Sequence, residues 1–142
     1  MTVKNVLFLC TGNSCRSQMA EGWARQLLGG AVRPFSAGTA PQGVDPRAVQ
    51  VMAEAGVDLS GQASKGLEDL PALQFDAVIT LCDRAKESCP FFPGGVLRLH
   101  RGFEDPAVLA RDAAEEASAL RPYRRVRDEI REFVRELPDR LE

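Results

Sequence analysis

The sequence predicts one α/β domain, spanning residues 1–142, in which helices flank a four-stranded parallel sheet. Two observations support this prediction. Short apolar runs rich in β-branched residues alternate along the chain with longer segments of helical periodicity, which is typical of strands joined by crossover helices. No repeat or low-complexity tract interrupts the alternation, and a chain of this length makes one ordinary domain with a proper core.

The first expected strand and helix are separated by a polar turn. Residues 3–9 form an apolar run bounded by that turn, which indicates a buried strand. From Ser17 the chain has apolar side chains at helical spacing, and the glycines at 29–30 predict the end of this helix. Residues 32–39 follow as the expected second strand.

The middle of the chain repeats the alternation of helix and strand. Asp45 and Pro46 combine a favoured N-cap with a favoured first helical residue, so a helix is expected from there through Ala55. Residues 75–82, FDAVITLC, are apolar and rich in β-branched side chains, which indicates another buried strand. Residues 95–100, GVLRLH, are the expected fourth strand.

The C-terminal region predicts one long amphipathic helix. Segment 103–118 is alanine-rich and acidic, and we expect a loop with one short helix there. Pro122 is expected to begin the last helix, because proline fits the first helical turn. The apolar face of that helix is formed by Tyr123, Val126, Ile130, Phe133, Val134 and Leu137.

Composition and charge exclude several classes of function. Apolar residues make up 44% of the chain and charged residues 27%, as in soluble globular proteins. The formal net charge of −2 is too small to favour nucleic-acid or membrane partners. The N-terminus lacks the features of a signal peptide, and no segment is long enough to span a bilayer. We therefore expect a cytoplasmic protein, and nothing in the sequence indicates an assembly larger than a monomer.

Four cysteines are the most informative residues: Cys10, Cys15, Cys82 and Cys89. A structural disulfide framework is disfavoured without a secretory signal, because the cytosol keeps thiols reduced. Zinc is disfavoured as well, since its ligands usually come in pairs two to four residues apart. The spacings here are four and six intervening residues, and His100 is the single histidine. Catalytic or redox thiols remain, against the alternative of small buried hydrophobic side chains.

The turn of residues 11–16, which we call the oxyanion loop, has the composition of an anion-binding loop. It follows the first strand and leads into a helix N-terminus, so successive backbone N–H groups can surround one anion. Gly12 and Asn13 tolerate the positive φ angles that such a curled loop requires. Arg16 has the planar fork that binds two anion oxygens at once.

Cys10, at the end of the strand, is the expected nucleophile. The positive field of the oxyanion loop favours its thiolate form, and the Ser17 hydroxyl can donate a hydrogen bond to that sulfur. The alternative is a tight turn with a buried cysteine. The residues expected to bind the oxyanion are Thr11, Gly12, Asn13, Ser14, Cys15, Arg16 and Ser17.

The sequence resembles a known family. The stretch CTGNSCRSQMAEGWA, residues 10–24, resembles the phosphate-loop signature of the thioredoxin-coupled arsenate reductases, which have the low-molecular-weight tyrosine phosphatase fold. The segments SAG, TLCDRAKESCP, GFEDPA and RVRDEI match in the same order, so the resemblance spans nearly the whole chain. It implies a low-molecular-weight tyrosine phosphatase-like fold and arsenate reduction, with Cys10 as nucleophile and Arg16 as oxyanion clamp.

Cys82 ends the third expected strand, and Cys89 follows seven residues later. On a helix, residues at this spacing lie roughly 10 Å apart along the axis, whereas a disulfide needs Cα atoms within about 7 Å. A Cys82–Cys89 bond therefore requires a segment that is never helical or one that unwinds. A buried strand cysteine and an unrelated loop thiol are the alternative.

The resemblance assigns these two thiols to a redox relay. It implies that Cys10 attacks arsenate, that Cys82 attacks the Cys10 sulfur as arsenite leaves, and that Cys89 then attacks Cys82. Thioredoxin would reduce the resulting disulfide of Cys82 and Cys89. The last two steps are thiol–disulfide exchanges, which need a thiolate and an accessible path.

Asp105 is the expected general acid. It precedes Pro106, which restricts it to extended backbone on a loop, and the resemblance gives it the role of protonating the departing oxygen. Glu104 is the neighbouring candidate, and an Asp-Pro pair is otherwise often only a turn.

Cys15 is a weaker candidate for a catalytic thiol than Cys10, and we expect it to pack under the oxyanion loop.

One position departs from the family in a way that concerns cations. Some members bind potassium with residues that match Asn13, Glu21 and Ser36 and with an aspartate where this chain has Lys65. An ammonium group there opposes a cation. We therefore expect no potassium dependence, no metal site and no tightly bound cofactor.

Two other functions remain open at this stage. A low-molecular-weight phosphatase would use the same loop with water as the second nucleophile, but it usually has an aromatic residue where Ala107 follows the Asp-Pro pair. A non-enzymatic arsenic sensor would usually carry a DNA-binding element, and none is evident. The expected partners are arsenate, with phosphate or sulfate as competing oxyanions, and thioredoxin. A weak phosphatase side activity is also expected.

Overall fold

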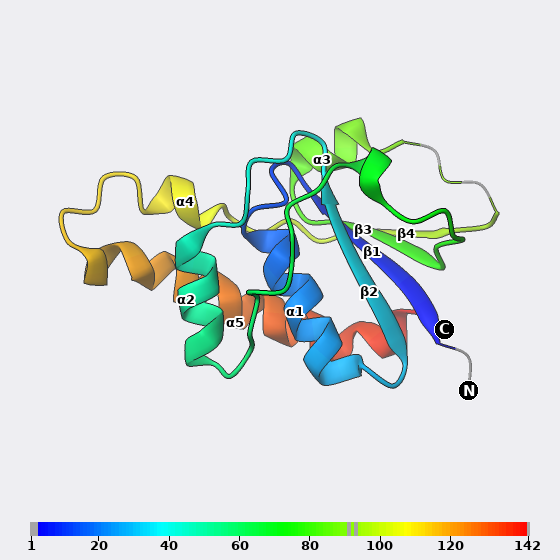
Figure 1. Cartoon of the computed structure of the whole chain (residues 1–142), viewed down its shortest axis with the longest axis horizontal. Helices are drawn as coiled ribbons and strands as arrows, with labels where there is room; N and C mark the ends of the chain where they lie inside the picture. The colour runs from blue at the N-terminus through cyan, green and yellow to red at the C-terminus, as the bar shows by residue number, and fades with distance from the viewer. Residues whose placement is uncertain (1–2, 91, 93, 142) are drawn as a thin grey trace.

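A computed structural model of the chain describes residues 3–90, 92 and 94–141. Its elements are, in order, β1 (Lys4–Cys10), α1 (Arg16–Leu28), β2 (Val32–Gly38), α2 (Pro46–Glu54), the 3₁₀ turn η1 (Leu67–Asp69), β3 (Ala77–Thr80), α3 (Asp83–Ser88), β4 (Leu97–His100), α4 (Pro106–Leu109) and α5 (Glu116–Arg140) (Figure 1). The predicted α/β fold with a four-stranded parallel sheet is confirmed.

The sheet has the strand order β2-β1-β3-β4, and all three pairings are parallel. Strand β1 lies inside the sheet, and its residues 6–10 are all buried, as its continuous apolar run predicts. The register pairs Cys10 with Gly38 and Leu9 with Thr80, so neighbouring strands end at the same edge. The segments that follow β1 and β3, the oxyanion loop and α3, therefore meet at that edge.

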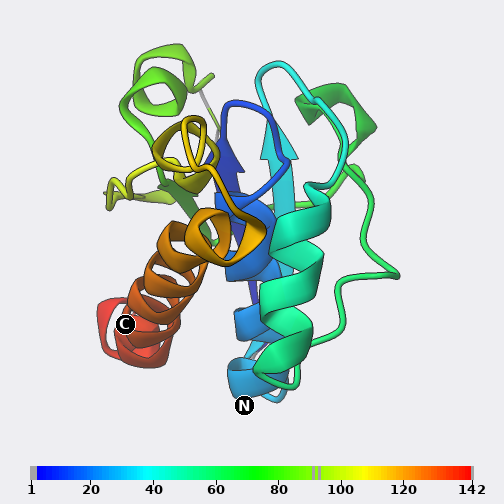
Figure 2. The same ribbon diagram turned by 90° about the vertical axis from the view of Figure 1, so that its left-hand side faces the viewer.

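Helices α1, α2 and α5 pack against one another on one side of the sheet (Figures 1 and 2). The prediction for α2 is confirmed, because Asp45 is its N-cap and accepts a hydrogen bond from the Arg47 N–H (2.9 Å) with Pro46 as the first helical residue. Gly56 follows the helix with φ at +85°, a conformation that favours glycine. The N-cap at Asp45 sets the point at which the chain enters α2, and that point lies close to the oxyanion loop.

The prediction that Pro122 begins the last helix was wrong, because α5 begins six residues earlier, at Glu116. A proline inside a helix loses one backbone hydrogen bond. Ala119 and Leu120, which precede the proline, are buried, so the burial of this first turn outweighs that loss. The predicted apolar face is confirmed, since Tyr123, Val126, Ile130, Phe133, Val134 and Leu137 are all buried.

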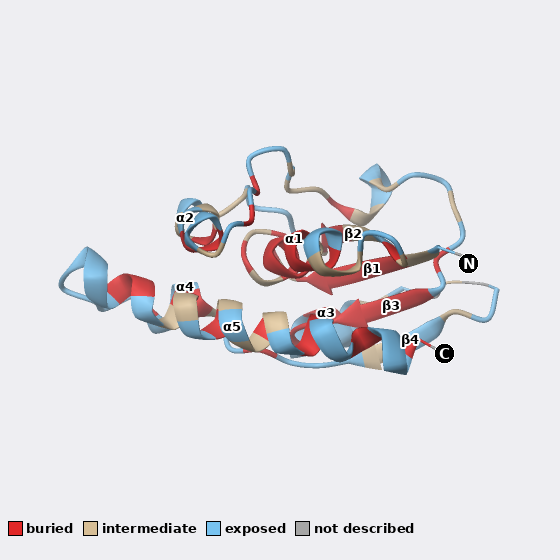
Figure 3. Cartoon of the chain, turned by 90° about the horizontal axis from the view of Figure 1, so that it is seen from below, coloured by how far each residue is buried: buried red, intermediate tan, exposed pale blue. Residues whose placement is uncertain are grey.

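Burial is uneven across the molecule (Figure 3). Buried residues form most of β1, all of β3 and the inner faces of α1 and α5, whereas α3 buries only Ala85 and β4 has no buried residue. Helix α3 and strand β4 are thus thinly packed compared with the centre of the sheet. Within the described ranges, no helix is both long and apolar enough to cross a membrane.

Candidate active site

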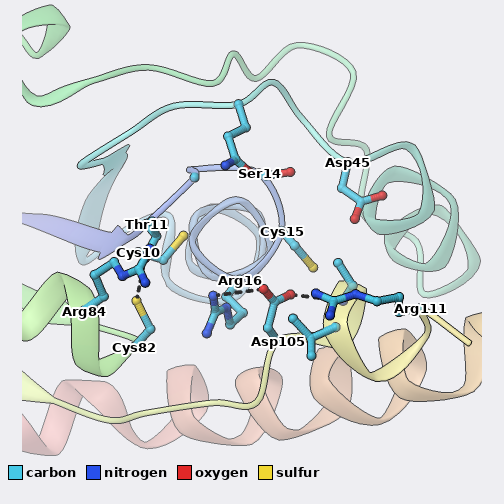
Figure 4. Close-up of a pocket in the computed structure, with 14 residues that line it drawn as sticks. Cys10, Thr11, Ser14, Cys15, Arg16, Asp45, Cys82, Arg84, Asp105 and Arg111 are labelled. Atoms are coloured by element: carbon cyan, nitrogen blue, oxygen red, sulfur yellow. Dashed lines mark hydrogen bonds and ion pairs between the residues drawn. The ribbon is translucent and has the colours of Figure 1, made fainter.

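A cavity of about 490 Å³ opens at the carboxyl end of the sheet, where β1 and β3 end (Figure 4). It is lined by side chains from the oxyanion loop, the start of α3 and the turn before α4. The structure brings together four residues that the sequence predicted for chemistry: Cys10, Arg16, Cys82 and Asp105. Cys89, the fifth, lines a separate pocket at the other end of α3.

Asn13 determines the shape of the oxyanion loop. Its φ of +45° is the only positive value among the described residues other than glycine, and its side chain is fully buried. The Asn13 Oδ1 accepts hydrogen bonds from the Lys65 N–H (2.8 Å) and from Gln18 Nε2 (2.9 Å). The predicted role of Asn13 in curling the loop is confirmed. The same expectation for Gly12 was wrong, because its φ is not positive.

Gly38, at the end of β2, lets the loop approach the sheet. A Cβ atom there would lie 2.6 Å from the Thr11 carbonyl oxygen and 2.7 Å from the Asn13 nitrogen. Both distances are shorter than van der Waals contact, so only glycine leaves room for the loop backbone. The SAG segment noted in the sequence therefore has a steric function beside the oxyanion loop.

The backbone N–H groups of the loop are available to a ligand. No described residue accepts a hydrogen bond from the N–H groups of Gly12, Ser14 or Cys15, and all three residues line the cavity. The N-terminus of α1 begins directly afterwards at Arg16. Unpaired amides beside a helix N-terminus form an electropositive site that suits a tetrahedral oxyanion.

The sulfur of Cys10 lies 2.9 Å from the Ser17 hydroxyl oxygen. Asn13 Nδ2 donates a hydrogen bond to the same hydroxyl (2.8 Å), so the Ser17 proton is free to point at the sulfur. Cys10 is only 2% exposed, which shields it from other reactants. The Cys10 sulfur is therefore held by a hydrogen bond to Ser17 at the end of β1, beside the unpaired amides of the oxyanion loop.

The Arg16 side chain extends from the end of the oxyanion loop to the segment before α4. Its Nη1 donates to the Phe103 carbonyl (3.0 Å), and its Nη2 lies 3.5 Å from the Asp105 carboxylate. Asp105 is the N-cap of α4, where its other oxygen accepts a hydrogen bond from the Ala107 N–H (3.0 Å). Both side chains are thus oriented at the rim of the cavity.

The alternative acid, Glu104, points elsewhere. Its carboxylate forms an ion pair with Arg125 of α5 (3.1 Å), and it does not line the cavity. The geometry therefore favours Asp105 over Glu104 for any proton transfer in the cavity.

Cys82 faces the same cavity from the start of α3. It is the N-cap of the helix, and its sulfur lies 3.3 Å from the Thr11 hydroxyl oxygen (Figure 4). Asp83 is the first helical residue, and its carboxylate lies 3.2 Å from His100 Nε2. The oxyanion loop therefore contacts a second sulfur besides that of Cys10.

Cys89 is the C-cap of α3, so the segment between the two thiols is helical. Helical geometry places residues seven apart at roughly 10 Å along the axis. All four cysteines are free thiols in this structure. Of the two options that the sequence left open, the one in which the segment is never helical is wrong, so a Cys82–Cys89 disulfide requires α3 to unwind.

Cys15 differs from Cys10 and Cys82 in its position at the cavity. Its side chain lies on the opposite side of the α1 N-terminus from Cys10 (Figure 4). Burial, and then the negative charge of Asp45, raise the pKa of the Cys15 thiol well above its usual value. A thiol that stays protonated at neutral pH is a poor nucleophile, which supports packing as its role.

Several lining residues were not predicted as members of the site: Gln42, Asp45, Arg84, Ala107, Val108 and Arg111. Asp45 showed only the pattern of an N-cap, yet it also accepts a hydrogen bond from the Tyr123 hydroxyl (2.5 Å). Burial and this carboxylate raise the pKa of Tyr123. Arg84 offered one signal, its position two residues after Cys82, whereas Gln42 and Arg111 lie on loops without a motif.

The ammonium group of Lys65 lies where we expected it to disfavour a potassium ion. Lys65 Nζ lies 3.7 Å from Glu21 Oε1 and donates a hydrogen bond to the Ala63 carbonyl (2.9 Å). The Ser36 hydroxyl donates to the same Glu21 oxygen (2.6 Å). In the described parts of the chain, no three His, Cys, Asp or Glu side chains are grouped so as to hold a metal ion.

Comparisons with known proteins agree with this geometry. The family described as low molecular weight phosphotyrosine protein phosphatase matches residues 5–142. An arsenate reductase of Bacillus licheniformis is 48% identical over 135 residues, which are 95% of each chain. An arsenate reductase of Bacillus subtilis is 46% identical over 139 residues, or 98% of each chain.

Solved structures show the same similarity. An arsenate reductase in the oxidized state superposes with a TM-score of 0.80 at 34% identity, covering 99% of this chain and 100% of that one. A thioredoxin-dependent arsenate reductase from Corynebacterium glutamicum gives a TM-score of 0.72 at 27% identity, covering 98% of this chain and 62% of that one.

Proposed function

Because the chain belongs to the low molecular weight phosphotyrosine protein phosphatase family, we propose that its cavity binds an oxyanion, and that this protein reduces arsenate to arsenite. The observation that favours reduction over hydrolysis is the second sulfur at the cavity. Cys82 contacts Thr11 of the oxyanion loop and lines the cavity together with Cys10. A hydrolase of phosphate esters needs water there and no second thiol.

In the first step, the Cys10 thiolate attacks arsenate. The unpaired amides of the oxyanion loop and the Arg16 guanidinium bind the oxygens, so the charge that develops is stabilised by donors already in place. A bond forms between the Cys10 sulfur and arsenic, and one oxygen leaves. Asp105, beside Arg16 at the rim, supplies the proton that makes this oxygen a water molecule.

In the second step, the Cys82 thiolate attacks the Cys10 sulfur. A Cys10–Cys82 disulfide forms, the sulfur–arsenic bond breaks, and its electron pair stays on arsenic, which leaves as arsenite. Thus two thiols are oxidised by two electrons and arsenic(V) becomes arsenic(III). The Thr11 hydroxyl lies 3.3 Å from the Cys82 sulfur and can donate a hydrogen bond to it during this attack.

In the third step, Cys89 attacks Cys82 and releases Cys10 as a thiolate. This exchange requires α3 to unwind, because its two ends are too far apart for a disulfide. Thioredoxin then reduces the Cys82–Cys89 disulfide. Support for thioredoxin comes from the similarity to the Corynebacterium glutamicum enzyme, and support for an unwinding α3 comes from its single buried residue.

A second activity, weak hydrolysis of aryl phosphates, follows from the shared first step. Phosphate is tetrahedral like arsenate, so Cys10 can form a phosphocysteine that water hydrolyses. Ala107 lies at the cavity where an aromatic side chain would stack on a phenyl ring, and this favours only slow hydrolysis. Phosphate and sulfate are expected to compete with arsenate.

The biological role that fits this chemistry is arsenic detoxification in the cytoplasm by a monomeric enzyme. A reducing compartment keeps the three relay thiols reduced between turnovers, which a thiol relay requires. Lys65, whose ammonium group contacts Glu21, makes potassium unnecessary for the fold around the oxyanion loop.

The test is arsenate-dependent oxidation of NADPH in the presence of thioredoxin and thioredoxin reductase. We expect turnover with the native protein and none with Cys82→Ser. Full turnover of Cys82→Ser would refute the relay. If the native protein hydrolyses aryl phosphates but oxidises no NADPH with arsenate, the phosphatase interpretation is correct instead.

A further inference from the structure

Cys89 has different surroundings from the other two thiols of the proposed relay. Cys10 lies beside the unpaired amides and Ser17, and Cys82 lies at the N-terminal end of α3 with the Thr11 hydroxyl. Cys89 instead follows the last residue of α3, where the free carbonyl groups carry partial negative charge. These carbonyls oppose a thiolate, so a group that stabilises one is needed nearby.

Arg98, from strand β4, contacts the Cys89 sulfur. Its Nη1 lies 3.5 Å from the sulfur, and its Nη2 donates to the Pro90 carbonyl (3.1 Å). The guanidinium also lies 6.0 Å from the centre of the Phe92 ring. These contacts orient one N–H group at the thiol, and N–H donors stabilise a thiolate more than a thiol.

The charge of Arg98 is not neutralised by an acidic partner. Eight arginines of the described chain form ion pairs with carboxylates, but Arg98 forms none there. The pocket of about 270 Å³ around Cys89 has three lining residues that can carry charge, Lys86, Arg98 and His100, and no carboxylate. Every other group that can carry charge among the residues lining this pocket is therefore a potential cation, and the Asp83 carboxylate of α3, which does not line it, contacts His100.

We propose that Arg98 is a further catalytic residue, which raises the thiolate population of Cys89 for the third step. The proposal rests on the relay above. In that step a bond forms between the sulfurs of Cys89 and Cys82, and the Cys82–Cys10 bond breaks. The electron pair leaves with the Cys10 sulfur, so no additional reductant is needed, and the proton lost by Cys89 beforehand goes to solvent.

The expected size of the effect follows from thiol chemistry. An ordinary cysteine is only a few per cent thiolate at pH 7, and the thiolate is the species that attacks. A hydrogen-bonded guanidinium at a partly exposed sulfur should raise that fraction by about tenfold. Without Arg98, the third step slows while arsenite release does not.

The experiment measures Cys89 itself, without arsenate. In a Cys10→Ser, Cys82→Ser background, alkylation of Cys89 by iodoacetamide is followed by peptide mass spectrometry as a function of pH. We expect Arg98→Gln to slow alkylation at pH 7 by about tenfold and to move the midpoint of the profile upward by about one pH unit. Arg98→Lys should restore most of the rate, because it returns the charge.

Lys86→Gln is the matched control, since it removes a charge from the same pocket but from a side chain that makes no hydrogen bond to Cys89. It should leave the profile within about twofold of the parent. An unchanged profile in Arg98→Gln, or an equal shift in both variants, would overturn the proposal. Circular dichroism of each variant identifies loss of fold, and the Arg98→Lys profile decides the matter if Arg98→Gln unfolds.

A second measurement separates this proposal from the relay. With all native cysteines, Arg98→Gln and one equivalent of arsenate should release arsenite at the native rate and accumulate the Cys10–Cys82 disulfide. If that disulfide never forms in any variant, the proposed relay is wrong, whereas the alkylation profile still decides whether Arg98 acts on Cys89. Slower release of arsenite in Arg98→Gln would count against a role confined to the third step.

Discussion

The oxyanion loop and helix α3 lie side by side at one edge of the sheet, yet they are held in opposite ways. Asn13 at the centre of the loop is fully buried, and its side chain makes hydrogen bonds to α1 and to residue 65. Helix α3 has six residues, of which one is buried, and the following thiol is partly exposed. The loop is built to keep its shape, whereas the helix can be unfolded at small cost.

This difference matches what each region has to do. A site that stabilises developing charge works best when its donors need no rearrangement. A disulfide between the two ends of α3 needs the opposite, because a rigid helix would keep the thiols apart. In the proposed mechanism, a rigid segment attacks the oxyanion and a pliable segment takes up the oxidised state, and the two meet where the Thr11 hydroxyl contacts the Cys82 sulfur.

The largest expected effects are losses of activity, and they differ between a thiol beside the oxyanion loop and a thiol at the end of α3. Cys10→Ser should reduce both arsenate turnover and aryl phosphate hydrolysis by at least roughly 10³-fold, because both begin with its thiolate. Cys89→Ser should abolish thioredoxin-coupled arsenate turnover but leave aryl phosphate hydrolysis intact. Steady-state assays of both reactions measure this. Equal loss of both activities in Cys89→Ser would mean that Cys89 supports the fold and not the relay.

The next effect concerns the unwinding of α3 when the Cys82–Cys89 disulfide forms. The Lys86 N–H donates to the Cys82 carbonyl (3.1 Å), and Lys86→Pro removes that hydrogen bond, costing the helix about 3 kcal/mol. Only the reduced form has the helix, so the Cys82–Cys89 disulfide should become harder to reduce, with a potential about 60 mV more negative. Redox titration against glutathione measures it.

Lys86→Ala is the control for that titration, because it removes the same charge and keeps the helix. It should leave the potential within about 10 mV of the native value. An unchanged potential in Lys86→Pro would show that α3 does not unwind on oxidation.

A smaller effect tests the rigidity of the oxyanion loop. Gly38→Ala places a Cβ 2.6 Å from the Thr11 carbonyl oxygen, which should cost about 1–3 kcal/mol of stability and weaken phosphate binding. Urea unfolding, and the rise in melting temperature with added phosphate, measure the two quantities. Gly30→Ala is the matched control, since no atom lies within 4 Å of its new Cβ. Comparable losses in both variants would indicate a general effect of alanine and not the close approach.

The smallest effect is expected from potassium. Lys65 Nζ already lies 3.7 Å from the Glu21 carboxylate, so a bound cation would meet an ammonium group. Activity and melting temperature should be the same in potassium and sodium salts at equal ionic strength. A clear rise with potassium would contradict this, and Lys65→Asp, which removes the ammonium group, is the variant in which such a rise is expected.

The fold could be predicted from sequence wherever a local pattern decided it. The strand before Cys10, the cap at Asp45 and the apolar face of α5 each depend on a few neighbouring residues, and the structure confirms them. The start of α5 could not be predicted in this way, because Pro122 is a local signal that the burial of Ala119 outweighs.

The site was predictable to the extent that a motif marks it. The loop residues and Cys82 carry such patterns, but Gln42 and Arg111 reach the cavity from loops whose course depends on the whole fold. The choice between Asp105 and Glu104 needed the ion pair of Glu104 with Arg125. The contact of Arg98 with Cys89 joins a strand to the end of a neighbouring helix, and neither sequence segment indicates it.

The central claim is that two sulfurs at one cavity reduce the oxyanion, and a single turnover tests it most directly. Cys89→Ser is mixed with one equivalent of arsenate without thioredoxin, and arsenite and disulfides are then quantified by speciation and by non-reducing peptide mapping. We predict one equivalent of arsenite and a trapped Cys10–Cys82 disulfide. Arsenite without that disulfide, a disulfide between Cys10 and Cys15, or no arsenite at all would contradict the claim.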